Sequence, residues 1–401
     1  MPWRMLLAAA TLALGWSAAR AADEEPLRIG VLEDLSGPNS ENSGVGTVEA
    51  VKMAVEDFGG KVLGRPIQVL VATDQNKPDV AVSIARQWFG PQHVAMITGL
   101  PNSASSLAVN QIARETDKID IVAAAASSDI TGKGCSPNSI HWFMDTYASG
   151  SNLVSALISL GWDTWFFVTV DYNFGLALQA DATRFIEARG GKVLGSAKHP
   201  LGETDFSSVL LRAQASGAKV IALANASADL DNAIKGAKEF HLVENGQHLA
   251  VFFLNTPNVA VVGQAEMAGS IGVTPIFPAL NPETLAWSHR LVERVPAVHV
   301  PTAQQLGAYG AVLHYLKAVA AAGTSETGPV LAKMREMPVN DPMTRNGRVR
   351  EDGRLLRDLY VFQVKPPSES TDPFDYFKVL KTIPAEQAFR PLKDGNCPYV
   401  R

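Results

Sequence analysis

Short apolar runs alternate with amphipathic stretches along most of the chain. The run 27–35 is rich in aliphatic residues, and 46–60 follows it with Val48, Val51 and Val55 on one helical face. An apolar run of this length predicts a buried strand, and the 3.6-residue spacing of the valines predicts a helix. The helix is expected to stop at the two glycines that close the stretch, since glycine favours a C-terminal cap.

The same alternation continues for about 250 residues. Further strands are predicted at 65–73, 93–100, 119–127, 164–171, 192–199, 218–226 and 249–255. Further helices are predicted at 78–89, 103–117, 151–161, 174–191, 205–217 and 228–242. Near-continuous apolar strands separated by amphipathic helices are typical of a parallel sheet that is covered on both faces. The pattern therefore predicts an α/β fold with right-handed crossovers.

A break in the pattern at 132–150 divides these elements into two successive doubly wound units. The last third of the chain differs, with a long helical stretch at 301–323 and β-prone pieces at 346–365 and 374–383. Two arrangements remain open for this third. It forms a tail behind two independent tandem domains, or it returns to complete both units and makes a hinge of several crossings.

The amino terminus carries the features of a secretory signal peptide. Arg4 precedes an apolar run from Met5 to about Trp16, and small residues in an A-x-A arrangement follow at 19–21. The run is too short to cross about 30 Å of hydrocarbon, and its flanks match a cleavage site. We therefore expect residues 1–21 to be removed and the protein to be exported to the periplasm.

Composition and charge narrow the function classes. The net charge of −5 and the lack of a basic stripe argue against nucleic acid, whose phosphates need clustered lysine and arginine. Neither the cysteines nor the scattered histidines have zinc-ligand spacing, so no metal is expected. Cys135 and Cys397 are the two cysteines, and in an oxidising compartment they form a disulfide, stay unpaired, or pair with another chain.

Catalytic motifs are missing from the sequence. It contains no G-x-S-x-G elbow, no phosphate-binding G-x-x-x-x-G-K-[ST] loop and no H-E-x-x-H zinc helix. The run 27–35 is followed by glycines whose spacing does not fit a dinucleotide-binding loop. We therefore expect no enzyme and no cofactor.

The stretch 97–110, ITGLPNSASSLAVN, ends an apolar strand in polar residues and then starts a helix. In an open α/β sheet, ligands bind beyond the carboxyl ends of the strands, where the first N–H groups of the following helices are free. These groups carry partial positive charge and suit a carboxylate. On the residues alone, Ser103 either caps its own helix or contacts a ligand, and the two roles are compatible.

The chain resembles the type I periplasmic binding proteins, and most closely the branched-chain amino acid (Leu/Ile/Val) receptors of ABC importers. The segments 26–38, 44–88, 97–109 and 168–178 carry the resemblance, and it extends over essentially the whole mature chain. It implies two doubly wound Rossmann-like lobes joined by a three-strand hinge, with the ligand held between them. It also implies no chemical step, because closure of the lobes is what a membrane permease recognises.

The resemblance also points to individual ligand contacts. Ser103 matches the ligand-binding serine of a G-x-x-x-S pattern that begins at Gly99, and Phe174 matches an aromatic that closes over the ligand. Ala126 stands where amino acid receptors usually have threonine, although Ser127 is adjacent. The predicted ligand-binding residues are Ser43, Asn102, Ser103, Ala124, Ala126, Ser127, Tyr172, Phe174, Asn225 and Thr256.

One departure from the family bears on the ligand. The segment 252–258, FFLNTPN, matches the family segment that carries an acid against the ligand's ammonium, yet it offers Asn255 and Thr256. A buried ammonium without a counter-charge costs several kcal/mol. Unless Asp171 or Asp229 compensates, the ligand has no α-ammonium. We then expect an uncharged polar molecule or a carboxylate, such as an aromatic acid.

The sequence thus predicts an extracytoplasmic solute-binding receptor that works with an ABC permease and is a monomer. Two alternatives remain, a sensing receptor for a membrane kinase or chemoreceptor and a strict branched-chain amino acid binder. The expected N-terminal lobe comprises 22–143 and about 276–350, and the expected C-terminal lobe comprises 147–275 and about 355–401.

Overall fold

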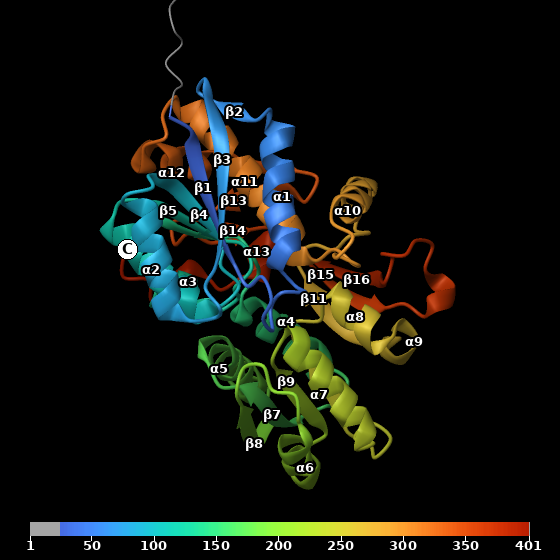
Figure 1. Ribbon diagram of the computed structural model, residues 1–401. Helices are drawn as coiled ribbons and strands as arrows, with labels where there is room; N and C mark the ends of the chain where they lie inside the picture. Colours follow the sequence, from blue (N-terminus) through green and yellow to red (C-terminus); the bar gives the residue numbers. More distant parts are fainter. Residues whose placement is uncertain (1–24, 401) are drawn as a thin grey trace, which may run out of the picture.

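The computed structural model describes residues 25–400 and has two α/β lobes, each built on its own sheet (Figure 1). The signal peptide expected at 1–21 lies outside the described residues. We define the first lobe as the six-stranded sheet with its helices and the second lobe as the four-stranded sheet with its helices. The two doubly wound lobes confirm the predicted fold class.

The sheet of the first lobe has the order β2-β3-β1-β4-β5-β6. Its strands are β1 (Leu27–Glu33), β2 (Lys61–Val62), β3 (Arg65–Thr73), β4 (Val94–Gly99), β5 (Ile119–Val122) and β6 (Ser139–His141). All neighbours are parallel except β2, which forms a short antiparallel pair with β3.

Two pairs of helices cover this sheet. The helices α1 (Gly44–Phe58) and α11 (Ala303–Ala322) pack together on one face, and α2 (Pro78–Phe89) and α3 (Ser103–Glu115) pack together on the other. Successive side chains of a strand point to opposite faces. Met96 of β4 accordingly joins the core beneath α1, whereas Ile97 joins the core beneath α2. The long helix α11, from the last third of the chain, thus packs with the first lobe.

The second lobe repeats this plan with the order β10-β9-β7-β8. Its strands are β7 (Thr164–Val170), β8 (Lys192–His199), β9 (Val220–Ala224) and β10 (His248–Val251), and its helices are α4 (Thr146–Ile158), α5 (Asn173–Ala188), α6 (Ser207–Ala215) and α7 (Ser227–Glu239). Phe167 of β7 packs in the core with α4 and α5, and Phe166 packs in the core with α6 and α7. The aromatic run of β7 is therefore buried on both faces.

The remaining elements form two small antiparallel sheets and short helices. One sheet comprises β11 (Ile271–Thr274), β15 (Leu359–Val364) and β16 (Phe377–Ile383), and the other comprises β12 (Val339–Asp341), β13 (Thr344–Val349) and β14 (Leu355–Leu356). The helices are α8 (Thr256–Val262), α9 (Gln264–Met267), α10 (Pro282–Arg294), α12 (Thr327–Glu336) and α13 (Ala385–Ala388). Figure 1 shows the sheet of β11, β15 and β16 beside α8, at the level where the two lobes meet.

Two predicted strands are shorter in the structure. The strand expected at 119–127 ends at Val122, because the next backbone N–H groups donate to the carbonyls of Gly99 and Leu100 in the loop after β4. The strand expected at 249–255 ends at Val251, and α8, which the pattern did not predict, begins a few residues later with Pro257 in its first turn. Both strands leave their sheet early where the chain turns toward the gap between the lobes.

A disulfide joins the carboxyl-terminal tail to the first lobe. Cys135 and Cys397 are bonded, with their Cα atoms 5.6 Å apart across a sequence separation of 262. Arg390 lies in the same tail, and its Nη2 donates to the carbonyl oxygen of Ser128 at 3.0 Å. The tail therefore returns to the loop that follows β5.

We expect loss of this disulfide to destabilise the protein. Removing a native disulfide typically lowers the free energy of unfolding by about 2–5 kcal/mol, and long closed loops lie toward the upper end. Urea unfolding should show this decrease on adding dithiothreitol, and a Cys135→Ser/Cys397→Ser variant should show it without reductant. An oxidised protein whose stability does not respond to dithiothreitol would contradict the expectation, and the double variant in dithiothreitol is the control.

Candidate functional site

The topology of both sheets creates a crevice at the same relative position. In the first lobe the chain passes from β1 to β3 on one side and then to β4 on the other, and in the second lobe β8 and β9 flank β7 in the same way. Ligands of open α/β sheets bind at such switch points, beyond the carboxyl ends of the strands. The two crevices face each other and form a cavity that is open to solvent, with about 390 Å³ of empty space, the solvent at its mouth included.

The cavity is lined by residues that follow strand ends in both lobes. They are Asn39, Asn42 and Ser43 after β1, Pro101 after β4, Ala124 and Ala126 after β5, Phe143 after β6, Tyr172 and Phe174 after β7, Ala226 and Ser227 after β9, Phe253 after β10, and Gln304 at the start of α11. Among the residues that the structure describes, no charged side chain lines it.

Half of the predicted ligand-binding residues line this cavity. They are Ser43, Ala124, Ala126, Tyr172 and Phe174. The other five, Asn102, Ser103, Ser127, Asn225 and Thr256, are buried behind the lining and are bonded to other groups.

Asn102 and Ser103 hold the cavity wall from behind. The Oδ1 of Asn102 accepts from the N–H groups of Ala104 and Ser105 at 2.9 and 3.1 Å, so this side chain caps α3. The Ser103 hydroxyl oxygen accepts from the N–H of Ser127 at 3.3 Å. That bond fixes the strand-end segment that carries Ala124 and Ala126. The capping role expected for Ser103 belongs to Asn102, and Pro101 is the residue of this loop that lines the cavity.

The remaining three side chains also serve local bonds. The Ser127 hydroxyl oxygen accepts from the N–H of Asp129, and the Thr256 hydroxyl donates to the carbonyl of Pro301. Asn225 Nδ2 lies 3.3 Å from Nε2 of His199. None of these three residues lines the cavity in the structure.

Sequence reasoning missed several lining residues. Ala226 and Phe253 lie next to predicted positions at strand ends, so the strand-end rule could have found them. Phe143 lies in an aromatic segment for which packing in a hinge or lining of a cleft were both conceivable. Gln304 follows a helix cap more than 50 residues beyond β10, and no local signal connects it to the cavity.

Aromatic rings form one continuous wall. Phe174 contacts Phe253 edge-to-face with ring centroids 5.1 Å apart, and Phe253 lies 6.4 Å from Phe143. Tyr172 lies 6.0 Å from Phe174. Burial raises the pKa of the Tyr172 hydroxyl, so it stays a neutral hydrogen-bond donor. The wall is therefore apolar except for the Tyr172 hydroxyl.

Three helices begin at the cavity without a bond from their own N-cap side chain among the described residues, although in α1 the Glu33 carboxyl accepts from the N–H of the first residue, Gly44. Their N-cap residues are Ser43 for α1, Tyr172 for α5 and Ala226 for α7, and all three line the cavity. The first N–H groups of a helix lack internal partners and carry about half a positive charge together. This end of the cavity therefore favours an anionic or electron-rich group.

Carboxyl groups occur near the cavity but not on its lining. Burial raises the pKa of Glu33 to about 8, of Asp229 to about 7 and of Asp231 to about 6. Glu33 accepts from the N–H of Gly44 at 3.1 Å, Asp229 accepts from the N–H of Gly202, and Asp231 accepts from Nδ2 of Asn258. Each thus already accepts a bond from the protein, although Oε1 of Glu33 has no partner among the described residues.

The two acids considered as partners for a ligand ammonium lie elsewhere. Asp171 is half exposed and pairs with Lys198 at 2.9 Å, and Asp229 binds a backbone N–H. The segment 252–258 contributes Phe253 to the lining, while the N–H of Asn255 donates to Oδ1 of Asn258 within the first turn of α8. The cavity therefore presents no carboxylate to a ligand among the described residues.

Direct bonds join the lobes at both sides of the cavity. Asn42 Nδ2 donates to the Ser227 hydroxyl at 2.8 Å, and Asn173 Nδ2 donates to the Asp129 carboxylate at 3.1 Å. The Ser128 hydroxyl donates to the buried carboxylate of Asp181 at 2.7 Å. The structure is thus in a closed arrangement.

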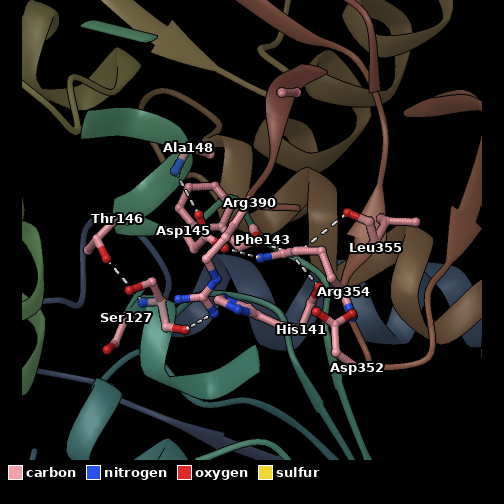
Figure 2. Close-up of polar contacts among 12 residues, drawn as sticks. Ser127, His141, Phe143, Asp145, Thr146, Ala148, Asp352, Arg354, Leu355 and Arg390 are labelled. Atoms are coloured by element: carbon pink, nitrogen blue, oxygen red, sulfur yellow. Dashed lines mark hydrogen bonds and ion pairs between the residues drawn. The ribbon is translucent and has the colours of Figure 1, made fainter. Parts of the chain in front are cut away.

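A buried arginine holds the first crossover between the lobes (Figure 2). Arg354 is fully buried and donates to the carbonyls of His141 and Phe143, and its Nη1 lies 3.4 Å from the Asp145 carboxylate. The other Asp145 oxygen caps α4 through the N–H of Ala148. Burial lowers the pKa of the Arg354 guanidinium to about 10, which leaves it charged at neutral pH. This cluster fixes the backbone from which Phe143 reaches the cavity.

Two α/β lobes with a cavity between the carboxyl ends of their sheets define a bilobal binding protein. Residues 26–371 match the family described as periplasmic binding protein, and the chain belongs to that family.

Solved structures agree over nearly the full length. A periplasmic binding protein from Burkholderia mallei is 39% identical, has a TM-score of 0.91 and covers 94% of this chain and 99% of its own. A branched chain amino acid ABC transporter periplasmic ligand-binding protein from Burkholderia xenovorans is 35% identical, with a TM-score of 0.81 and coverage of 93% and 99%.

More distant relatives are also similar. An ABC transporter solute-binding protein from R. palustris in complex with 4-hydroxybenzoate shares the fold at 20% identity, with a TM-score of 0.81 and coverage of 90% and 97%. The Leu/Ile/Val-binding protein homolog 6 of Brucella abortus is 26% identical over 53% of this chain and 54% of the relative. The chain thus spans about half the length of that curated relative.

Two features are absent from residues 25–400. None of their helices is both long and apolar enough to cross a membrane, and they contain no group of three or more His, Cys, Asp or Glu side chains able to hold a metal ion.

We expect Arg354→Met to lower the free energy of unfolding by about 3–5 kcal/mol, because it leaves the Asp145 charge buried without its partner. Urea unfolding measures the loss. Asp145→Asn is the matched variant, since asparagine keeps the cap on α4 but removes the charge. The double variant should lose less than the sum of the two single losses. A loss below 0.5 kcal/mol for Arg354→Met would contradict this role of the guanidinium.

Proposed function

We propose that this protein is the periplasmic solute-binding component of an ABC import system and that it closes around a small carboxylate with an aromatic ring and no ammonium group. The observation that carries the proposal is the lining of the cavity, which combines helix N-termini whose N-cap side chains make no cap bond, and aromatic rings, with no charged side chain.

The helix N-termini support an anionic group on the ligand. Helices α1, α5 and α7 span 15, 16 and 13 residues, so each has a full macrodipole with its positive end at the cavity. Each such end favours an anion by about 0.3–1 kcal/mol when exposed and up to about 2 kcal/mol when partly buried. A carboxylate held by backbone N–H groups needs no arginine or lysine.

The same lining disfavours an amino acid. A zwitterion would bring its ammonium into a cavity without a carboxylate partner, at a cost of several kcal/mol. Glu33, Asp229 and Asp231 offer little compensation, because burial raises the pKa of each and the protein's own N–H groups or amides already occupy them.

The aromatic wall supports a flat apolar body. Phe143, Phe174 and Phe253 present faces and edges that suit a ring, and such pairs gain about 0.5–1.5 kcal/mol beyond the area that they bury. The R. palustris relative with 4-hydroxybenzoate shows that this fold accommodates an aromatic acid. The Burkholderia xenovorans relative, named for branched-chain amino acids, marks the competing ligand class.

In this proposal Ser43, Ala124, Ala126, Tyr172 and Phe174 contact the ligand, and Ser103 and Asn102 hold the wall behind them. Binding stabilises the closed arrangement, by no more than the ligand's differential affinity for the closed and open states. The closed form then docks to a membrane permease as a monomer without a chemical step. The predicted signal peptide supports a periplasmic location.

The proposal is tested by ligand binding. Purified protein is titrated calorimetrically with benzoate, the three monohydroxybenzoates, phenylacetate, leucine and valine, after a thermal-shift screen in which a ligand at 100 times its Kd adds about 2.7 kcal/mol of stability. We expect at least one aromatic acid to bind at least 100-fold more tightly than leucine. Tighter binding of leucine or valine would refute the ligand class.

A charge placed in the lining gives a sharper test. Ala226 is the N-cap of α7 with extended backbone, so Ala226→Asp is compatible with the helix and adds a carboxylate to the cavity. We expect it to weaken binding of an aromatic acid at least about 100-fold through repulsion. Ala226→Asn is the matched uncharged control. It should bind the aromatic acid more tightly than Ala226→Asp does, by most of this factor. Equal affinities of the two variants would contradict a carboxylate near α7.

A further inference from the structure

Among the described residues, two buried amide oxygens of the cavity lining lack a hydrogen-bond partner, Oδ1 of Asn42 and Oε1 of Gln304. Asn42 is 4% exposed, and its Nδ2 donates to the Ser227 hydroxyl at 2.8 Å. Its Oδ1 has no hydrogen-bond partner within residues 25–400. A buried acceptor without a partner is costly, so such an atom in a ligand cavity points to a donor on the ligand.

The orientation of this amide depends on a chain of bonds that begins at Asp34. The Oδ2 of Asp34 accepts from the N–H of Asn39 at 2.9 Å and from Nδ2 of Asn76 at 2.8 Å. A carboxylate oxygen that already accepts a backbone N–H cannot donate to an amide oxygen. Asn76 must therefore turn its nitrogen to Asp34 and its oxygen away.

The next links follow from that orientation. The Oδ1 of Asn76 accepts from Nδ2 of Asn39 at 2.9 Å, which leaves Oδ1 of Asn39 to accept from the Ser227 hydroxyl at 3.3 Å. The Ser227 proton is then used, so its oxygen can only accept from Asn42. Flipping the Asn42 amide would place two oxygens against each other. The relay from Asp34 through Asn76, Asn39 and Ser227 thus fixes Asn42 Oδ1 as an acceptor.

We propose that Asn42, oriented by this relay, determines ligand specificity by requiring an O–H or N–H donor on the ligand, so that the protein selects hydroxylated aromatic acids over the parent acid. This inference rests on the proposed function and narrows its ligand class. Gln304 provides a contrast, because its Oε1 is also unpartnered but no bond from residues 25–400 fixes its amide. Its amide can turn either its oxygen or its nitrogen toward the ligand. Gln304 therefore discriminates less than Asn42 between ligands with and without a donor.

The relay crosses between the lobes. Asn39, Asn42 and Asn76 belong to the first lobe, and Ser227 starts α7 of the second lobe. Asn42 therefore gains its fixed orientation only when the lobes close, and the requirement for a donor applies to the closed state. A ligand without the donor leaves a buried acceptor unpaired in the closed form and stabilises closure less.

The experiment compares each hydroxybenzoate isomer with benzoate on the full mature chain. For the wild type we expect the best isomer to bind at least about 10-fold more tightly than benzoate, the factor for one buried acceptor left unpaired. In Asn42→Leu this ratio should fall to about 1, because the acceptor is gone. Equal affinities of the wild type for benzoate and every isomer would overturn the inference but leave the proposed function standing.

A second variant tests the relay without touching the cavity. Asn76 has a φ of 57°, which glycine adopts freely, and it is not among the lining residues. Asn76→Gly removes the link that fixes Asn39, so the ratio of the affinity for the hydroxylated acid to that for benzoate should fall several-fold. Gln75→Gly is the matched control, since Gln75 has a φ of 53° and no side-chain bond in the relay.

The outcomes separate the two proposals. An unchanged ratio in Asn76→Gly would refute the orienting relay, and an unchanged ratio in Asn42→Leu would refute the role of Asn42. Failure of every aromatic acid to bind, together with tight binding of leucine, would overturn the proposed function and with it this inference.

Discussion

The arrangement of the cavity depends on how the buried Arg354 guanidinium satisfies its donors. A charge taken out of water costs several kcal/mol unless partners surround it, and here the carbonyls of the first crossover and the Asp145 carboxylate fill that role. The same bonds join the segment after β6 to the segment before β14, which are more than 200 residues apart. Because Phe143 lies on the crossover, the hinge and the aromatic wall are positioned by one interaction.

Sheet topology then decides which residues meet. In each sheet the order in which strands are added reverses at the first strand, which is β1 in one lobe and β7 in the other. The loops after these strands therefore face each other. The lining is supported by residues behind it and by bonds within it. Asn102 and Ser103 hold the wall from behind, and the proposed relay runs from Asn76 behind the lining through Asn39 to Asn42, both of which line the cavity. The lining itself can thus remain free of charge.

The sequence predicted the lobes and part of the site, for identifiable reasons. Tyr172 and Phe174 were predicted from the family resemblance of their segment, and they line the cavity because the helix α5 starts directly after β7. Ser103 does not reach the lining because of the turn that precedes it, in which Gly99 and Leu100 have positive φ of 91° and 59°. This turn brings Pro101 to the cavity and directs Asn102 back onto its own helix. Gln304 lies at the cavity because α11 packs on α1. No local sequence pattern predicts this long-range contact.

The absence of an acid from the segment 252–258 acquires a structural reason in this context. The position next to Phe253 is used to start α8, where the N–H of Asn255 donates to the side chain of Asn258, and Asn258 in turn donates to Asp231. The Asp231 carboxylate therefore serves the contact between α7 and α8 rather than a ligand. The buried carboxyl groups near the cavity thus accept hydrogen bonds from the protein's own backbone and side chains. What the receptor offers a ligand is backbone N–H groups, aromatic faces and one oriented amide oxygen, which together describe a hydroxylated acid better than an amino acid.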